Sequence, residues 1–426
     1  MREDLLHYIW KFKKLSNEGL KTVNSENITV QNVGSHNQFS GPDFFNAKLM
    51  IGQQLWAGNV EIHVKSSDWY VHNHQEDPGY DNVILHVVWE DDISVYRLDG
   101  TEIPTLELKN IIDQDLLGNY QKLFTNRKVG FINCGYDINV LPKFNLDNWK
   151  ERLYFERLEQ KSDLILKLLQ EYNNDWEKVL FVLLLKNFGS KVNGDCFYQL
   201  GRYLDFSIVR HFIDKPFDLE SILLGLAGLL DKEDLNDGYY RELRTNYVFF
   251  KAKYGFDEIN TLKAAFFKLR PSNFPTIRLS QFAALYAHKN NLFQELMSAD
   301  GEDVYKLFDI RAGNYWNTHY TFGKTTGSRS KGLSKKFIDL MIINTIVPLK
   351  FCYIRYKGET PNDSFFDIIQ NIEKENNSIV ENYIKLGVSI ENARDSQAIL
   401  QLYDNYCNKN KCLQCAVGTE LLNIKP

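Results

Sequence analysis

The sequence has no surplus of basic residues, and it has little cysteine. Its 50 lysines and arginines stand against 55 acidic residues, which gives a formal net charge of -5. This balance excludes a protein whose whole surface attracts nucleic acid and leaves only a local basic groove compatible with that function. Six cysteines in 426 residues do not make a disulfide scaffold. In a reducing compartment they would stay thiols or bind metal.

The sequence also lacks an apolar run that could direct secretion or cross a membrane. The first residues, MREDLL, carry acid where a secretory signal is basic, and no apolar stretch follows them. The longest apolar run, 337–354, is too polar for a membrane span because of four residues within it. These are Asp339, Asn344, Pro348 and Lys350. We therefore expect a cytoplasmic protein with no membrane partner.

The composition is that of a globular protein, and the spacing of the apolar residues changes along the chain. With 44% hydrophobic residues over 426 positions, two or three domains are expected. Residues 2–14 have helical spacing, and residues 28–98 alternate or are β-branched, including one predicted strand over 55–71. We predict an α+β fold, with a small mixed α/β domain at 1–140 (one helix and four to five strands) and a larger all-helical region at 141–426.

A row of ionisable residues lies on the predicted strand 55–71. Because residues two apart on a strand share a face, Glu61, His63 and Lys65 form one row. Asp43 begins the preceding strand, and a hairpin through the Ile-Gly-Gln-Gln turn would bring it beside Glu61. Two carboxylates beside a base suit Mg²⁺ or Mn²⁺, which could activate water for attack on a phosphate. A competing interpretation is a solvated Glu61–Lys65 ion pair, with Asp43 as a turn residue.

Histidine is concentrated near the start of the chain, since six of the nine lie within the first 86 residues. They are His7, His36, His63, His72, His74 and His86. His72 and His74 share a strand face or a loop, whereas His86 lies in the apolar sequence VILHVV, where it is either a core residue or a ligand. A zinc site from His72, His74 and His86 would make the protein a zinc-dependent hydrolase, although no fourth ligand is evident.

The motif PD at 42–43, followed after seventeen residues by EIH at 61–63, resembles the PD-(D/E)XK nuclease signature. The predicted order of one helix and then strands is similar to the core of that superfamily. The resemblance implies that Asp43 and Glu61 bind Mg²⁺ or Mn²⁺ and that Glu3 is an additional acid. It also implies that His63 or Lys65 positions the attacking water.

The departure from the signature is that His63 stands where the superfamily has lysine. Either Lys65 takes that role, or a histidine serves, as in nucleases resembling the very-short-patch repair enzymes, or the site is inactive. The segment SDWYVHNHQEDPGYDNVILHVV also resembles the Trp/His-rich segment that follows the active strand in short-patch-type nucleases. If so, His72 or His74 would be a general acid or a phosphate contact.

Two downstream segments combine basic and aromatic residues. FFKLRPSNFPTIRLSQ presents Arg270 and Arg278, and the basic loop, residues 310–336, has five basic residues and no acid between 324 and 336. Both segments could contact nucleic acid, and we expect DNA. The loop residues expected to do so are Lys324, Arg329, Lys331 and Lys335. The alternatives are an interhelical turn for the first segment and a solvated mobile loop for the second.

Cysteines gather at the end of the chain in the pattern Cys407-x4-Cys412-x2-Cys415. With Cys352 or Cys134 as a fourth ligand they could bind zinc or an iron–sulfur cluster. The pattern is somewhat similar to the iron–sulfur staple of some helicase-associated PD-(D/E)XK nucleases, with different spacing. The alternative is that they are free thiols closing the helical region.

Several segments together resemble a bacterial family catalogued as domain of unknown function 2851: GPDF, GNVEIHVKSSDW, DPGYDNVILHVV, RPSNFPTIRLSQ, GLSK, INTIVP and CLQC. This resemblance implies no activity, so function is inferred from the site. The leading hypothesis is a metal-dependent nuclease or an inactive descendant of one. The alternatives are a non-catalytic nucleic-acid-binding or scaffold protein, and a zinc-dependent hydrolase. Oligomeric state and sequence preference stay open.

Overall fold

The computed structural model describes residues 1–424, apart from 16–18, 38, 126–129, 136, 234 and 257–262. The chain forms two compact units. The first comprises Met1–Trp149, Asn382–Val388 and Leu402–Pro426, and the second comprises Lys150–Glu381 and Ser389–Gln401. The predicted α+β class is confirmed, because a six-stranded sheet lies near the N-terminus and a larger helical region follows it.

The segment from Leu402 onwards belongs to the first unit and not to the helical region in which we predicted it. Helix α18 (Ala416–Leu422) packs against α3 (Gln114–Thr125). The Asn119 side-chain amide donates to the Leu422 carbonyl at 3.3 Å. Helical periodicity shows which face of a helix is buried but not what covers it. The sequence pattern therefore could not show that this segment packs on α3. The prediction placed it in the helical region that precedes it in the chain.

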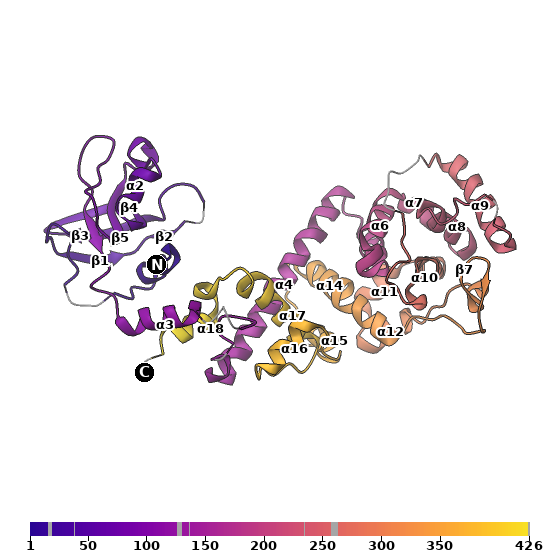
Figure 1. The fold of residues 1–426 in the computed structure, drawn as a ribbon. Helices are drawn as coiled ribbons and strands as arrows, with labels where there is room; N and C mark the ends of the chain where they lie inside the picture. The colour runs from indigo at the N-terminus through magenta and orange to yellow at the C-terminus, as the bar shows by residue number, and fades with distance from the viewer. Residues whose placement is uncertain are drawn as a thin grey trace. The chain divides into compact units, whose positions relative to one another are not determined.

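The sheet of the first unit is mixed, with the strand order β1-β3-β4-β5-β6 and β2 beside β3 (Figure 1). The strands are Ile28–Asn32 (β1), Ser35–His36 (β2), Phe44–Ile51 (β3), Gln54–Lys65 (β4), Val83–Glu90 (β5) and Thr105–Glu107 (β6). The strands β3 and β4 form the predicted hairpin, with Ile51 opposite Gln54. Gly52 in its turn has a φ of 60°, which glycine adopts readily. The strands β4, β5 and β6 are parallel.

The connection from β4 to β5 contains three short turns, so the strand predicted over 55–71 ends at Lys65. The turns are α2 (Asp68–Val71), η1 (His74–Glu76) and η2 (Pro78–Tyr80). The Asp68 carboxylate accepts the Lys65 backbone N–H at 3.0 Å. Short polar side chains compete in this way with strand pairing. Trp69 is fully buried against Tyr80, which fixes the turns beside the sheet.

Helix α1 (Glu3–Lys11) packs on β4. It buries Leu5, Leu6, Ile9 and Trp10, at the three- and four-residue spacing that one face of a helix requires. The Trp10 indole donates to the Val33 carbonyl at 3.0 Å. This anchoring orients the helix so that His7 meets the start of β3.

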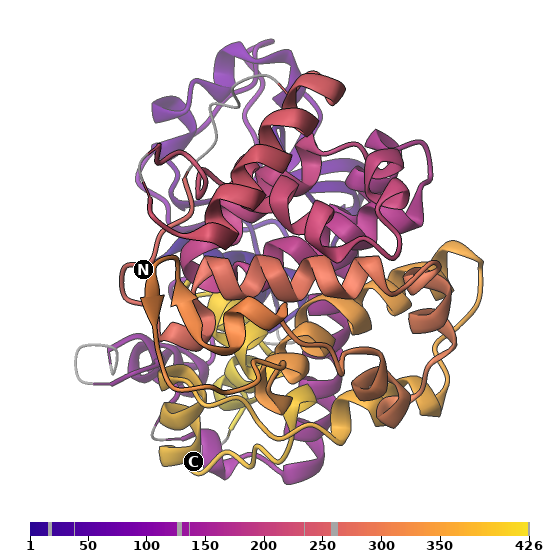
Figure 2. The ribbon, with the colours of Figure 1, turned by 90° about the vertical axis from the view of Figure 1, so that its right-hand side faces the viewer.

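The second unit is built mainly from helices. They are α4 (Lys143–Glu171, which begins in the first unit), α5 (Trp176–Phe188), α6 (Ser190–Tyr203), α7 (Phe206–His211), α8 (Pro216–Leu226), α9 (Gly238–Tyr254), α10 (Pro275–Ala287), α11 (Leu292–Ser298), α12 (Gly301–Leu307), α13 (Lys335–Met341), α14 (Val347–Tyr356), α15 (Asp363–Gln370), α16 (Ser378–Lys385, which ends in the first unit) and α17 (Ala393–Leu402). The prediction of an all-helical region is wrong in one detail, because β7 (His319–Thr321) and β8 (Lys324–Thr325) pair within the basic loop. Figure 2 shows them as orange arrows.

Helix α13, a π-helical turn and α14 form one continuous helix, Lys335–Tyr356. Among the described residues it is the one helix whose length and composition would suit a membrane span. Within its most apolar window, 72% of the residues are buried inside the structure. Such burial is what a core helix of a helical unit requires.

Candidate metal centre

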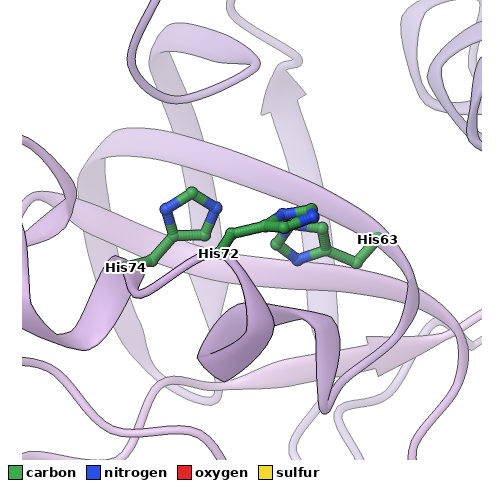
Figure 3. A group of neighbouring side chains, drawn as sticks. All are labelled: His63, His72 and His74. Carbon is green, nitrogen blue, oxygen red and sulfur yellow. The ribbon is translucent and has the colours of Figure 1, made fainter.

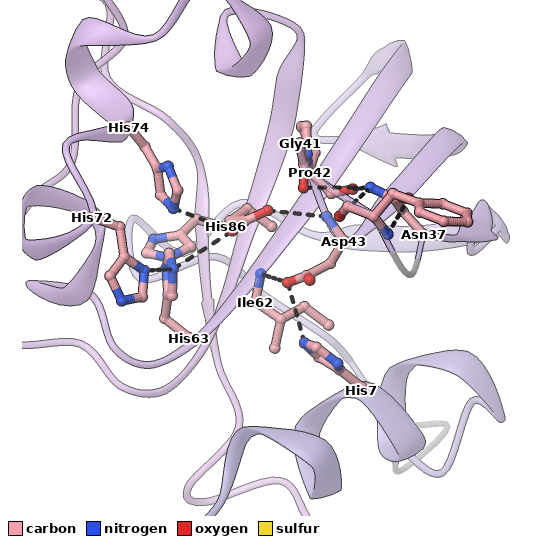
Figure 4. A network of polar contacts seen from close by, with 12 residues as sticks. His7, Asn37, Gly41, Pro42, Asp43, Ile62, His63, His72, His74 and His86 are labelled. Carbon is pink, nitrogen blue, oxygen red and sulfur yellow. Dashed lines mark hydrogen bonds and ion pairs between the residues drawn. The ribbon is translucent and has the colours of Figure 1, made fainter. Parts of the chain in front are cut away.

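The candidate centre lies in the first unit and draws residues from five elements (Figure 4). His7 comes from α1, Asp43 precedes β3, and Glu61 and His63 lie on β4. The turns after β4 supply His72 and His74, and β5 supplies His86. Because β4 and β5 are parallel, Glu61 is in register with His86. Residues that are 79 positions apart in the chain are therefore brought together.

Asp43 and Glu61 are joined through backbone amides. The Asp43 N–H donates to Glu61 Oε2 at 3.0 Å, and the Ile62 N–H donates to Asp43 Oδ2 at 3.0 Å. His7 Nε2 lies 3.1 Å from the same Asp43 oxygen. The hairpin thus places the two acids beside each other, as predicted, and Glu61 Oε1 is left facing the imidazoles.

Three imidazoles, those of His63, His72 and His74, lie close together (Figure 3), and two of them contact that oxygen. Among the described residues, His63, His72 and His74 are the set of His, Cys, Asp or Glu whose ligand atoms all lie within 4.8 Å of one another. His63 Nε2 is 3.1 Å from His72 Nδ1. Glu61 Oε1 lies 3.5 Å from His63 Nε2 and 3.4 Å from His74 Nε2. Ligand atoms around a tetrahedral ion at about 2.1 Å stand roughly 3.4 Å apart, so the 3.1 Å between His63 Nε2 and His72 Nδ1 suits two ligands of one zinc-like ion, with Glu61 Oε1 beside the set.

A fourth histidine supports the set from behind. His63 Nδ1 lies 2.8 Å from His86 Nε2, and His86 is fully buried. If His63 Nδ1 carries the proton, it donates to His86, and Nε2 presents its lone pair to the centre. An outer partner of this kind fixes the tautomer and ring plane of a metal-binding histidine. His74 is held by stacking on Tyr80, with ring centroids 3.8 Å apart.

Burial keeps the imidazoles of His63, His74 and His86 neutral. Burial and the neighbouring imidazoles lower the pKa of His63 to about 2, and the same two causes lower those of His74 to about 4 and His86 to about 3. Burial and the charge of Asp43 raise the pKa of Glu61 to about 9. Neutral imidazoles are ready ligands, and a buried carboxyl of this kind ionises readily only beside a cation.

His7 and Glu3 form the other side of the centre. Burial alone would lower the pKa of His7, but the hydrogen bond and charge of Asp43 outweigh it, and the pKa is raised. Burial raises the pKa of Glu3, and Asp43 raises it further, while His7 opposes this. Glu3 is thus an electrostatic neighbour of Asp43, and its role as an additional acid stays a prediction.

Lys65 does not join the centre. Its side chain is 55% exposed, and its Nζ lies 3.8 Å from Asp92. The alternative of a solvated Glu61–Lys65 pair is also wrong, because Glu61 is only 5% exposed and faces imidazoles. The zinc set predicted from His72, His74 and His86 changes in one member, since His63 takes the place of His86.

Two of the basic residues expected to contact nucleic acid are buried in the second unit. Arg278 donates to Asn273 Oδ1 at 2.6 Å and covers the ring of Phe337 at 3.5 Å. The Lys331 ammonium donates to the carbonyls of Trp316 and Asn317. Both side chains satisfy internal groups, so the prediction of a nucleic-acid contact is wrong for them. Charge patterns in sequence do not distinguish a buried cation from an exposed one.

The other four predicted contacts are exposed. Arg270, Lys324 and Arg329 lie at the surface of the second unit. Lys335 is also exposed, with its Nζ 3.3 Å from Asp339 on the same helix.

The predicted cysteine set is also changed. Cys407, Cys412 and Cys415 lie in the first unit, where Cys134 accompanies them, whereas Cys352 is buried in α14 of the second unit. Cys352 is therefore not the fourth member. Sequence spacing alone left that choice between Cys134 and Cys352 open.

His7 is the site residue for which the sequence predicted no role. The signal that could have found it is its place on the first helix, one turn after Glu3 and on the same face. His86 was predicted as a core residue or a ligand, and it lies behind the ligand set.

Comparison with known proteins gives one match. No curated protein and no solved structure matches the chain significantly. The model of one family, described as "Protein of unknown function (DUF2851)", matches residues 3–378. That range contains the whole candidate centre and most of the second unit. The chain therefore belongs to this family of proteins of unknown function.

Proposed function

We propose that the protein is a metal-dependent hydrolase of phosphodiester bonds in nucleic acid, with His63, His72 and His74 as the metal ligands. The observation that carries the proposal is the convergence of the ligand nitrogens of His63, His72 and His74, two of which, on His63 and His74, also lie within 3.5 Å of Oε1 of the buried Glu61. Three protein ligands are the number found in catalytic zinc sites, which keep one position for water. A structural zinc site would have four.

The donor set favours zinc over the magnesium expected from the sequence. Imidazole nitrogens suit Zn²⁺ and other transition metals, whereas Mg²⁺ prefers carboxylate and water oxygens. Mn²⁺ accepts both kinds of donor and is a suitable second metal for assays. A bound divalent ion would lower the pKa of a water molecule in its open position.

Glu61 and His7 are placed for the two proton transfers that hydrolysis requires. Glu61 Oε1 is adjacent to two ligand nitrogens, so it is placed to take the proton of the attacking water. His7, whose pKa is raised by Asp43, is placed to hold a proton for the leaving oxygen. His7 and Asp43 are each 22% exposed and His72 is exposed, so this side of the centre is open to a substrate.

The sequence motif around Asp43 and Glu61 favours nucleic acid as the substrate. The predicted resemblance to PD-(D/E)XK nucleases rests on Asp43 and Glu61, which the hairpin brings together. The arrangement of α1, a hairpin and a parallel strand after a crossover agrees with the element order used in that prediction. A non-catalytic nucleic-acid-binding protein is the second candidate, because the lysine expected beside Glu61 is turned to Asp92.

Metal analysis and cleavage assays test the proposal together. The purified chain is analysed for zinc and incubated with plasmid, single-stranded DNA and RNA in the presence of Zn²⁺, Mn²⁺ or Mg²⁺. His72→Ala should lose the metal and cleavage together. Glu61→Gln should keep the metal and reduce cleavage by about 10²-fold or more. His211→Ala, at an exposed histidine of α7, is the matched control.

The outcomes separate the candidates. Equal cleavage by wild type and both site variants would exclude this centre as the source of activity. Salt-sensitive binding of nucleic acid without cleavage under any metal condition would favour the non-catalytic candidate.

A further inference from the structure

Four of the six cysteines come together in the first unit, although up to 281 residues separate them in the chain. Cys134, Cys407, Cys412 and Cys415 line one small pocket. Cys134, Cys412 and Cys415 are buried, Cys407 is half-buried, and none forms a disulfide. The two cysteines of the second unit, Cys196 and Cys352, lie elsewhere. Two distant segments of the chain thus supply four cysteine sulfurs, which are soft ligands that suit thiophilic metals.

Hydrogen-bond donors point at these sulfur atoms. The Asn133 amide donates to Cys412 Sγ at 3.4 Å, and the Tyr383 hydroxyl lies 3.1 Å from Cys407 Sγ. The backbone N–H groups of Val417 and Gly418 are directed at Cys415. Donors around sulfur stabilise thiolates and tune metal–thiolate centres, whereas an apolar core of neutral thiols does not need them.

The backbone is also crowded at this place. A Cβ on Gly418 would stand 2.1 Å from the Cys412 carbonyl oxygen, so only glycine lets α18 approach the turn that carries Cys412. This close approach holds Cys412 and Cys415 at the same pocket. The close contact between Gly418 and the Cys412 carbonyl therefore shapes the turn that carries Cys412. Filling an apolar core does not require this contact.

Without a cation the four thiols are inert. Burial raises the pKa of each of them, to about 12 for Cys407 and about 11 for Cys415, and neighbouring sulfurs add to the effect for Cys134, Cys407 and Cys415. Reactive or redox-sensing cysteines have lowered pKa values, so that use does not fit these residues. A positively charged metal would reverse the effect, because it binds thiolates and releases their protons.

We propose that Cys134, Cys407, Cys412 and Cys415 bind a thiophilic metal centre that fastens the last segment of the chain to the first unit. The proposal is independent of the hydrolytic function. No three of these sulfurs lie within 4.8 Å of one another. Binding thus needs either a small rotation of the side chains onto one zinc ion or an iron–sulfur cluster, which spreads its thiolates more widely. Both sources use the same four-thiolate chemistry.

The test uses a protein without the histidine ligands, so that metal bound at the imidazole centre does not contribute to the measured metal content. The full-length His72→Ala/His74→Ala chain is purified without oxygen, and its zinc, iron and acid-labile sulfide are measured. We expect either about one equivalent of zinc or several irons with matching sulfide and visible absorbance. Adding Cys412→Ser/Cys415→Ser should abolish that metal. Adding Cys196→Ser/Cys352→Ser, at buried thiols of the second unit, should leave it unchanged.

A second measurement needs no cysteine variant. Chelated protein with all six cysteines and without the histidine ligands is titrated with Co²⁺, which should produce an intense near-ultraviolet thiolate-to-cobalt band. Zinc should displace the cobalt and remove the band. Absence of the band, together with metal content below a tenth of an equivalent, would overturn the proposal. Equal metal in the two serine pairs would overturn it as well.

Discussion

The Asp43 backbone N–H donates to Glu61 Oε2 at 3.0 Å, so the two acids of the candidate centre are linked through the main chain and not through a shared proton. The Ile62 N–H returns a hydrogen bond to Asp43 Oδ2 at 3.0 Å. Each carboxylate is thus held by the backbone next to the other one. Such reciprocal anchoring fixes the direction of both side chains without placing them face to face. Glu61 is free to face the imidazoles, while Asp43 faces His7.

Asp43→Asn should separate metal binding from chemistry. The asparagine oxygen can still accept the Ile62 N–H, and its own backbone N–H still holds Glu61, so metal content should stay within about twofold of wild type. The charge that raises the pKa of His7 is lost. We expect cleavage to fall by about 10²-fold or more. Zinc analysis and a pH profile of cleavage measure both effects, and parallel loss of metal would contradict the assignment.

His86 should affect metal affinity without touching the metal. His86→Phe removes the acceptor for His63 Nδ1, and loss of such an outer partner costs roughly 10–100-fold in metal affinity. His86→Gln keeps an oxygen that can accept the same proton and should recover part of the loss. Competition with a chelator of known affinity measures the difference. Equal affinities in the two variants would show that His86 only fills space.

Lys331 should matter for stability and not for binding nucleic acid. Its ammonium donates to the carbonyls of Trp316 and Asn317 and lies 4.1 Å from the Tyr320 ring centroid. Lys331→Met leaves both carbonyls without this donor, and we expect a loss of about 1–3 kcal/mol in the free energy of unfolding. Exposed Arg329→Ala should change it by less than about 0.5 kcal/mol. Urea unfolding measures both. A stable Lys331→Met that binds DNA more weakly would contradict this role.

Glu177 should make stability fall as the pH rises. Burial raises its pKa from 4.5 to about 7, although the Phe293 N–H hydrogen bond partly opposes this. A raised pKa in the folded state means that the contribution is complete below pH 4.5 and is lost as the pH rises through about 7. Glu177→Gln removes the titration. Its stability advantage over wild type should therefore grow between about pH 4.5 and 7 and level off above that, by about 1 kcal/mol or less after solvent screening.

Thermal unfolding of wild type and Glu177→Gln across that pH range gives the comparison. Both proteins are measured in the same buffers, so other titrating groups cancel. A constant difference between them at all pH values would show that Glu177 is already ionised in the folded protein.

Local patterns predicted the first unit well. The hairpin from Asp43 to Glu61 followed from two alternating segments around a glycine turn, and the apolar run around His86 gave the next strand. The strand predicted to continue to 71 ended early because Asp68 and Asp92 capture backbone N–H groups near Ser66. Side-chain competition of this kind depends on residues far apart in the chain, which a local pattern does not contain.

The candidate centre was predicted only in part for the same reason. Glu61, His63, His72 and His74 were singled out by their spacing, but spacing did not show that His63 joins the other two imidazoles. That depends on the turn at α2, which folds the segment after β4 back over its end. The buried state of Arg278 and Lys331 depends likewise on which helices surround them.

Because residues 382–388 and 402–426 belong to the same unit as residues 1–149, most of the second unit, residues 150–381, is an insertion within the first. On the ribosome, the sheet is made early but lacks α18 until the inserted residues have been synthesised. The first unit therefore cannot be completed before the inserted residues have been synthesised. A fragment that ends near residue 149 would lack two segments of its unit, so dissection of this protein should supply residues 382–388 and 402–426 together with that fragment.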